Sequence, residues 1–108
     1  MYTPSILVKF ISEIAGTFIF ILLILIITGR NSGALNVALP IGLALAISIY
    51  IFGDITGGHF NPAVSFAIFI KNPKAFTGLM LLIYIIAQVI GSYLALELNV
   101  YFNSTYLK

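Results

Sequence analysis

Polar and helix-breaking residues that could do chemistry gather in one stretch of this sequence, residues 55–65, which reads Ile-Thr-Gly-Gly-His-Phe-Asn-Pro-Ala-Val-Ser. Their chemistry is neutral hydrogen bonding, because an asparagine amide and glycine-flanked carbonyls offer donors and acceptors without charge. The sequence contains no nucleophile–base pair, phosphate-binding loop or metal cluster, so we expect no enzymatic activity and no cofactor. His59 lacks the cysteine or second histidine that a metal site needs.

The residue types of this stretch predict a short helix that begins inside a membrane. Proline excludes helix at the residue before it and fits the first helical position. We therefore expect an extended segment at 56–60, Asn61 as helix cap, and a helix from Pro62 to about Ile70. About nine residues at ~1.5 Å each reach ~13 Å, roughly half of a ~30 Å hydrocarbon layer. Open backbone at that depth survives only where protein covers it or water reaches it, so the stretch predicts a re-entrant loop beside a pore.

Composition places these residues in an integral, multi-pass membrane protein. Of 108 residues, 61% are hydrophobic and 7% are charged, against about 25% charged in soluble domains. We predict an all-α protein with spans at 10–29, 35–52 and 76–96, a re-entrant element at 55–70, and a polar tail from residue 99. A cleaved signal peptide is the rival interpretation of the first span, but the 14–27 core is long for one. The net charge of +2 is too small to suggest nucleic-acid binding.

Small residues four apart predict close helix packing in lipid, where packing rather than hydrophobicity drives association. The third predicted span carries Ala87, Gly91 and Ala95, and the second carries Gly42 and Ala46. Ala44 and Ser48 form a further pair on the second span. Chance occurrence in an alanine- and glycine-containing apolar sequence is the alternative.

Basic residues give a small orientation signal. With a cytoplasmic N-terminus, Lys9, Lys71 and Lys74 lie inside, while Arg30 and Lys108 lie outside. Three basic residues inside against two outside favour this orientation slightly, and so small a difference also permits insertion in both orientations.

Residues 57–65 resemble the first signature loop of the major intrinsic proteins, the aquaporins and glycerol facilitators. Two further patterns agree with the resemblance: Glu-Ile-Ala-Gly-Thr-Phe at 13–18, and Tyr-Ile-Ile-Ala-Gln at 84–88 followed by Gly91. The resemblance covers nearly all of the chain but only the first of the family's two inverted repeats. It implies an aquaporin-like half-fold of three transmembrane helices and one re-entrant half-helix as a single unit, residues 1–108. The second Asn-Pro-Ala motif and the selectivity arginine that follows it have no counterpart here, since Val64 follows this motif and Arg30 lies in the first loop.

The resemblance also implies roles for individual residues. The pore-lining and selectivity positions would be Gly57, Gly58, His59, Phe60, Asn61, Pro62, Ala63 and Ile41. Glu13 would brace the loop through backbone N–H groups, and Gln88 would join helices. An aliphatic Ile41 at the constriction predicts a wider and less polar passage than in a strict water channel. The alternatives are an ordinary cap for Asn61, a plain surface loop for residues 57–60, and a proton relay for Glu13.

These observations predict a passive pore for water or small uncharged solutes such as glycerol. Its partners would be the lipid bilayer, the solute, and a second half, supplied by an antiparallel copy or by a separately encoded chain. The alternative is a non-conducting truncated or regulatory protein that docks onto a complete channel through the Ala87/Gly91/Ala95 face. An ion-coupled transporter would need a charged residue in a midplane cavity, and Glu13 fits that role poorly.

Overall fold

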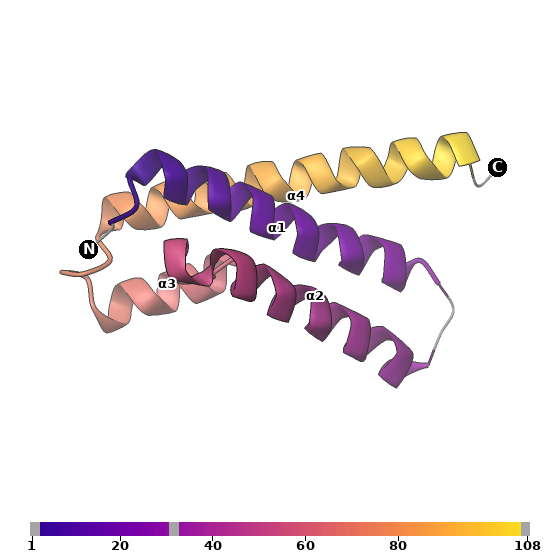
Figure 1. Ribbon diagram of the computed structural model, residues 1–108, viewed down its shortest axis with the longest axis horizontal. Helices are drawn as coiled ribbons and strands as arrows, with labels where there is room; N and C mark the ends of the chain where they lie inside the picture. The colour runs from indigo at the N-terminus through magenta and orange to yellow at the C-terminus, as the bar shows by residue number, and fades with distance from the viewer. Residues whose placement is uncertain (1–2, 31–32, 107–108) are drawn as a thin grey trace.

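The computed structural model describes residues 3–30 and 33–106, and it consists of four helices (Figure 1). They are α1 (Ile6–Thr28), α2 (Ala34–Thr56), α3 (Pro62–Lys71) and α4 (Gly78–Tyr106). In Figure 1 the three long helices run along the molecule, while α3 begins near its middle and returns to the end where α4 starts. The predicted all-α half-fold, with three long helices and one short re-entrant helix, is confirmed.

The lengths of the helices fit a bilayer. α1 and α2 have 23 residues each, and at ~1.5 Å per residue each reaches ~34 Å, enough for a ~30 Å hydrocarbon layer. α1, α2 and α4 are all long and apolar enough to cross a membrane. α3 has 10 residues, so it reaches ~15 Å, which is about half of that thickness.

Two helices continue beyond their predicted ends. α2 extends to Thr56 rather than ending at Phe52, and α4 extends to Tyr106 rather than ending at Leu96. The segment predicted as a polar tail from residue 99 continues α4 as helix as far as Tyr106. Loss of apolar character marks where lipid ends, but a helix continues until a breaker stops it, and neither glycine nor proline follows Gly91.

The interior of the bundle is polar and its exterior is apolar. The largest fully buried side chains include Tyr84, Phe60, Gln88, Glu13 and Thr17. Large aliphatic and aromatic side chains are instead exposed along all four helices. This distribution is the one expected in lipid, where apolar side chains gain nothing from burial and polar side chains need partners inside the bundle.

The small residues of α4 pack against α1 inside this chain. Ala87 and Ala95 are fully buried, and a Cβ atom on Gly91 would lie 2.6 Å from the carbonyl oxygen of Ile14. Only glycine fits at that contact. The Ala87/Gly91/Ala95 face is thus covered by α1, so the predicted use of this face to dock onto a complete channel is wrong.

α2 contacts α1 through its second pair of small residues rather than through Gly42 and Ala46. Ala44 and Ser48 are buried, and the Ser48 hydroxyl donates a hydrogen bond to the Gly16 carbonyl at 3.2 Å. Gly42 and Ala46 are exposed, and a Cβ atom on Gly42 would meet nothing within 4 Å. Their role in helix packing stays a prediction for contact with another chain.

Candidate functional site at the tip of α3

The loop between α2 and α3 turns through left-handed backbone. Gly57 ends α2 with φ 90°, and Gly58 follows with φ 68°. Glycine adopts these angles without steric cost. Thr56 belongs to α2 and its hydroxyl accepts a hydrogen bond from the Gly58 N–H at 2.9 Å. The extended segment predicted at 56–60 is therefore wrong, because consecutive glycines allowed a tighter reversal than an extended strand provides.

Phe60 also has a positive φ, 51°, although it carries a side chain. Such a conformation is uncommon for a bulky residue and persists only where the surroundings hold it. Its ring is buried against Gly16, where any Cβ atom would overlap it. The ring also meets Phe52 edge-on, with 6.3 Å between centroids. The glycine on α1 thus provides the space that allows the loop to pass.

Glu13 joins α1 to this loop. Its carboxylate is fully buried and accepts hydrogen bonds from the backbone N–H groups of His59 at 3.2 Å and Phe60 at 2.9 Å. A third donor, Nε2 of Gln88 on α4, lies 3.0 Å away. Charge-assisted hydrogen bonds of this kind are about twice as strong as neutral ones. This geometry matches the bracing role that the resemblance implies, and it favours that role over a proton relay because three fixed donors hold the carboxylate.

Gln88 extends the network to α3. Its Nε2 also donates to Oγ of Ser65 at 2.9 Å, so both amide hydrogens are used. Oγ of Ser65 lies 2.9 Å from Nδ1 of His59. The Ser65 hydroxyl can accept from Gln88 and also hydrogen-bond to His59, since it has one hydrogen and two lone pairs.

Aromatic rings complete the enclosure of His59. Its ring lies 5.0 Å from that of Phe76 and 4.9 Å from that of Tyr84, and the Tyr84 hydroxyl donates to the Thr56 carbonyl at 2.7 Å. Sequence reasoning missed the parts played by Ser65, Tyr84 and Phe76. Ser65 is the one hydroxyl-bearing residue in the otherwise apolar first part of α3, which is the signal that could have marked it as part of a buried polar network. No cluster of metal-binding side chains occurs among the described residues.

Asn61 caps α3 as predicted and lies at an exposed position. Its Oδ1 accepts a hydrogen bond from the Ala63 N–H at 2.9 Å, and Pro62 is the first helical residue. Because Oδ1 is engaged with the backbone, the amide group of Asn61 presents its N–H donors outward. The N-terminus of a helix carries roughly half a positive charge. Donors and positive polarisation therefore coincide at this point.

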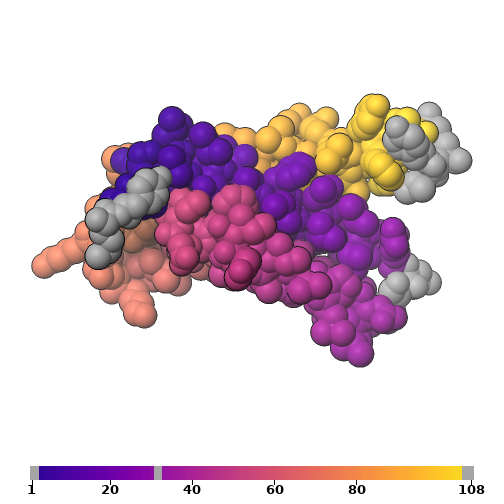
Figure 2. Space-filling model, in the orientation of Figure 1, coloured from indigo at the N-terminus to yellow at the C-terminus, as the bar shows by residue number. Residues whose placement is uncertain are grey.

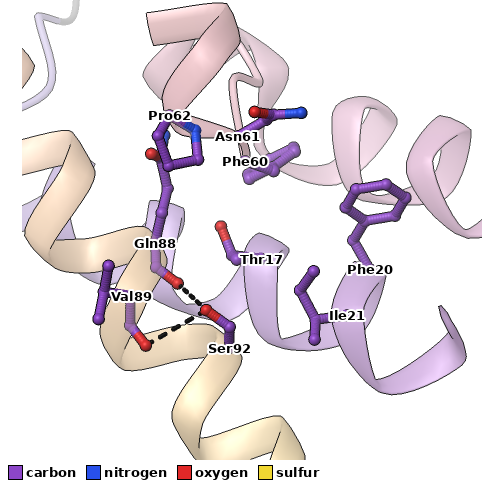
Figure 3. A pocket seen from close by; sticks show the side chains of 9 residues that line it. All are labelled: Thr17, Phe20, Ile21, Phe60, Asn61, Pro62, Gln88, Val89 and Ser92. Atoms are coloured by element: carbon purple, nitrogen blue, oxygen red, sulfur yellow. Dashed lines mark hydrogen bonds between the residues drawn. The ribbon is translucent and has the colours of Figure 1, made fainter. Parts of the chain in front are cut away.

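A cavity of about 220 Å³ adjoins the tip of α3 (Figure 3). It is lined by Thr17, Phe20, Ile21, Phe60, Asn61, Pro62, Gln88, Val89 and Ser92. Figure 3 shows these residues converging from α1, α4 and the loop before α3. Two buried oxygens of lining residues, Oγ1 of Thr17 and Oε1 of Gln88, have no hydrogen-bond partner among the described residues.

The other residues predicted to line a pore do not all lie at this cavity. Ile41 is half-buried near the start of α2 and does not line this cavity, so its place at a constriction stays a prediction. His59 and Phe60 have buried side chains, while Pro62 and Ala63 are exposed beside Asn61. The lining of a passage by the carbonyls of residues 57–60 likewise stays a prediction.

The chain was compared with known proteins. The family model described as Major intrinsic protein matches residues 1–106. The chain is 40% identical over 88 residues to the glycerol uptake facilitator protein-like 6 of Lactiplantibacillus plantarum, covering 81% of this chain and 40% of that protein. It is 40% identical over 84 residues to mouse aquaporin-8, covering 75% and 31%, and 35% identical over 99 residues to aquaporin Z of Photorhabdus laumondii, covering 81% and 40%. No solved structure matches it.

The chain belongs to the major intrinsic protein family. This confirms the resemblance found in the motifs, and it identifies an integral membrane protein of a family of channels for water and small solutes. The alignments span well under half the length of these three relatives.

Proposed function

We propose that this chain forms one half of a passive transmembrane pore for water or small uncharged solutes such as glycerol. The observation that carries the proposal is the tip of α3: a helix of 10 residues capped by Asn61, whose side chain is exposed. At ~1.5 Å per residue such a helix covers about half of a ~30 Å hydrocarbon layer, which would place this side chain near the middle of the bilayer. The names of the relatives support the solute class, since they include a glycerol uptake facilitator-like protein and aquaporins.

Electrostatics at the tip favours neutral permeants. The helix N-terminus is positively polarised, and the nearby carboxylate of Glu13 is fully occupied by three donors inside the protein. Cations and hydrated protons are repelled by such a field, while water and polyols can accept hydrogen bonds from the Asn61 amide. A pore of this kind needs no bound cofactor.

A second half completes the passage. α3 covers only about half of the membrane depth, so the remaining depth of the passage needs a second half-helix. An antiparallel copy of this chain is one source, because the near balance of basic residues permits both orientations. A separate second half of the same family is the other source.

Vesicle swelling tests conduction. The chain, reconstituted with its second half or at a density that allows pairing, should raise water or glycerol permeability above that of bare lipid with a low activation energy. Asn61→Asp should lower permeability several-fold, because it removes the outward amide donors and adds a negative charge at the helix tip. Asn36→Asp is the matched control, since Asn36 is exposed near the start of α2, away from this tip.

Permeability equal to that of bare lipid in every preparation would contradict the proposal, as would equal permeability of the Asn61→Asp variant and the parent. Epitope accessibility at the N-terminus separates the two sources of the second half. An antiparallel pair requires N-termini on both faces of the membrane, and their presence on a single face would leave only the separate second half.

A further inference from the structure

Another cavity, of about 580 Å³, lies between the ends of α1 and α4, away from α3. Its apolar walls are formed by Leu22, Leu25, Ile26, Leu98 and Phe102, Gly29 also lines it, and its polar residues are Arg30, Asn99 and Asn103. In Figure 1 these helix ends lie at the opposite end of the molecule from the returning end of α3. The proposed pore gives this cavity no role.

Helix lengths place the polar residues of the cavity at the membrane boundary. A ~30 Å hydrocarbon layer accommodates ~20 helical residues. Counted from Gly78, where α4 begins, this length ends near Leu98. Asn99 and Asn103 then lie in the headgroup layer, and Arg30 follows directly after the apolar run of α1. The cavity is therefore apolar on its hydrocarbon side and polar on its headgroup side.

We propose that this cavity binds one anionic phospholipid, with an acyl chain along the leucines and the headgroup phosphate against Arg30. The positive charge of Arg30 and the position of the cavity at the membrane boundary both favour this occupant. Arginine holds phosphate through two parallel hydrogen bonds, and Arg30 is the only arginine in the sequence. No acidic residue is among the described residues that line the cavity.

The two asparagines add neutral hydrogen-bonding capacity beside the arginine. Nδ2 of Asn103 donates to Oδ1 of Asn99 at 3.3 Å, which orients the pair one helical turn apart and leaves the Asn99 amide hydrogens as donors. Glu97 is exposed on the same helix, so its charge reduces the positive field but does not line the site. Lipid is also the amphiphile that surrounds this position at high concentration.

Native mass spectrometry of the purified chain tests the proposal. After equilibration with equimolar phosphatidylglycerol and phosphatidylcholine, the chain should retain phosphatidylglycerol in preference to phosphatidylcholine. Arg30→Gln should weaken phosphatidylglycerol binding about tenfold, because a charge-assisted contact to phosphate is lost. Lys74→Gln is the matched control: it removes one positive charge from an exposed turn at the other end of the molecule and should leave binding unchanged.

Equal retention of both lipids would overturn the proposal, as would equal loss of phosphatidylglycerol in the Arg30→Gln and Lys74→Gln variants. Leu25→Trp gives a second readout, because a bulky ring in the cavity should lower retention of phosphatidylglycerol while helical content by circular dichroism is unchanged. The sequence contains no cysteine, so Leu98→Cys can report a protein occupant. Interchain crosslinking through that cysteine without bound lipid would identify the cavity as an interface and would overturn the lipid assignment.

Discussion

Glu13 connects three parts of the fold through one buried carboxylate: α1, the loop before α3, and α4. A buried charge is costly, and here each donor it meets is a group that would otherwise be unsatisfied at membrane depth. The backbone N–H groups of His59 and Phe60 have no helix or strand partner to use instead. The carboxylate therefore replaces secondary structure at the point where the chain reverses.

Glu13→Gln tests this arrangement. The amide keeps the shape of the side chain but faces three donors with one acceptor oxygen, so at least one N–H group loses its partner. We expect a loss of about 1–3 kcal/mol in the free energy of unfolding, measured by thermal or denaturant unfolding in detergent. The control is Glu97→Gln, an exposed carboxylate on α4, which should change stability by less than ~0.5 kcal/mol. Equal stability of the two variants would contradict the bracing role.

The motif predicted the Asn61 cap and the start of α3 at Pro62, because these depend on local backbone rules. It could not predict the left-handed conformation of Phe60, since that conformation depends on the space left by Gly16, 44 positions earlier in the sequence. The hydrogen bonds of Ser65 and Tyr84 depend likewise on which helices become neighbours. Local rules specify caps and breakers, whereas these contacts exist only once α1, α3 and α4 are packed.

At the scale of elements, the close approach of α1 and α4 sets the position of everything attached to them. Small side chains on α4 let the two backbones come together, and this brings Gln88 within reach of Glu13. The spacing of Ala87, Gly91 and Ala95 predicted such a contact from sequence. It could not identify the partner, which proved to be α1 of the same chain rather than another protein.

Gly91→Ala tests the contact. The new Cβ atom would lie 2.6 Å from the Ile14 carbonyl oxygen and 3.2 Å from the backbone nitrogen of Phe18, and backbone atoms cannot rotate away. We expect destabilisation of about 1–3 kcal/mol, measured by unfolding in detergent.

Gly42→Ala is the matched control for this prediction. A Cβ atom there would meet nothing within 4 Å, and alanine is the better helix former, so stability should stay equal or rise by up to ~1 kcal/mol. Destabilisation by Gly42→Ala as large as that by Gly91→Ala would show that the loss reflects a general intolerance of substitution rather than the α1–α4 contact.

At the scale of the whole molecule, the fold is an apolar shell around a polar centre, and the centre positions one half-helix. Composition predicted the membrane environment and the number of spans, because these follow from long apolar runs. It overestimated how closely helix ends follow lipid boundaries, as α2 and α4 show. The sequence of this chain does not specify the second half of the proposed pore. That half would lie next to Asn61 and the cavity beside it.

The central claim is that the tip of α3 faces a water-filled passage, and thiol accessibility tests it most directly. Ala63→Cys places a single thiol at the exposed start of α3, and Leu43→Cys places one on the apolar outer surface of α2. In vesicles that contain the conducting assembly, a membrane-impermeant thiol reagent should modify residue 63 and block water flow, while residue 43 stays unmodified. A thiol at residue 63 that stays unreactive, or that reacts without any loss of permeability, would contradict the account.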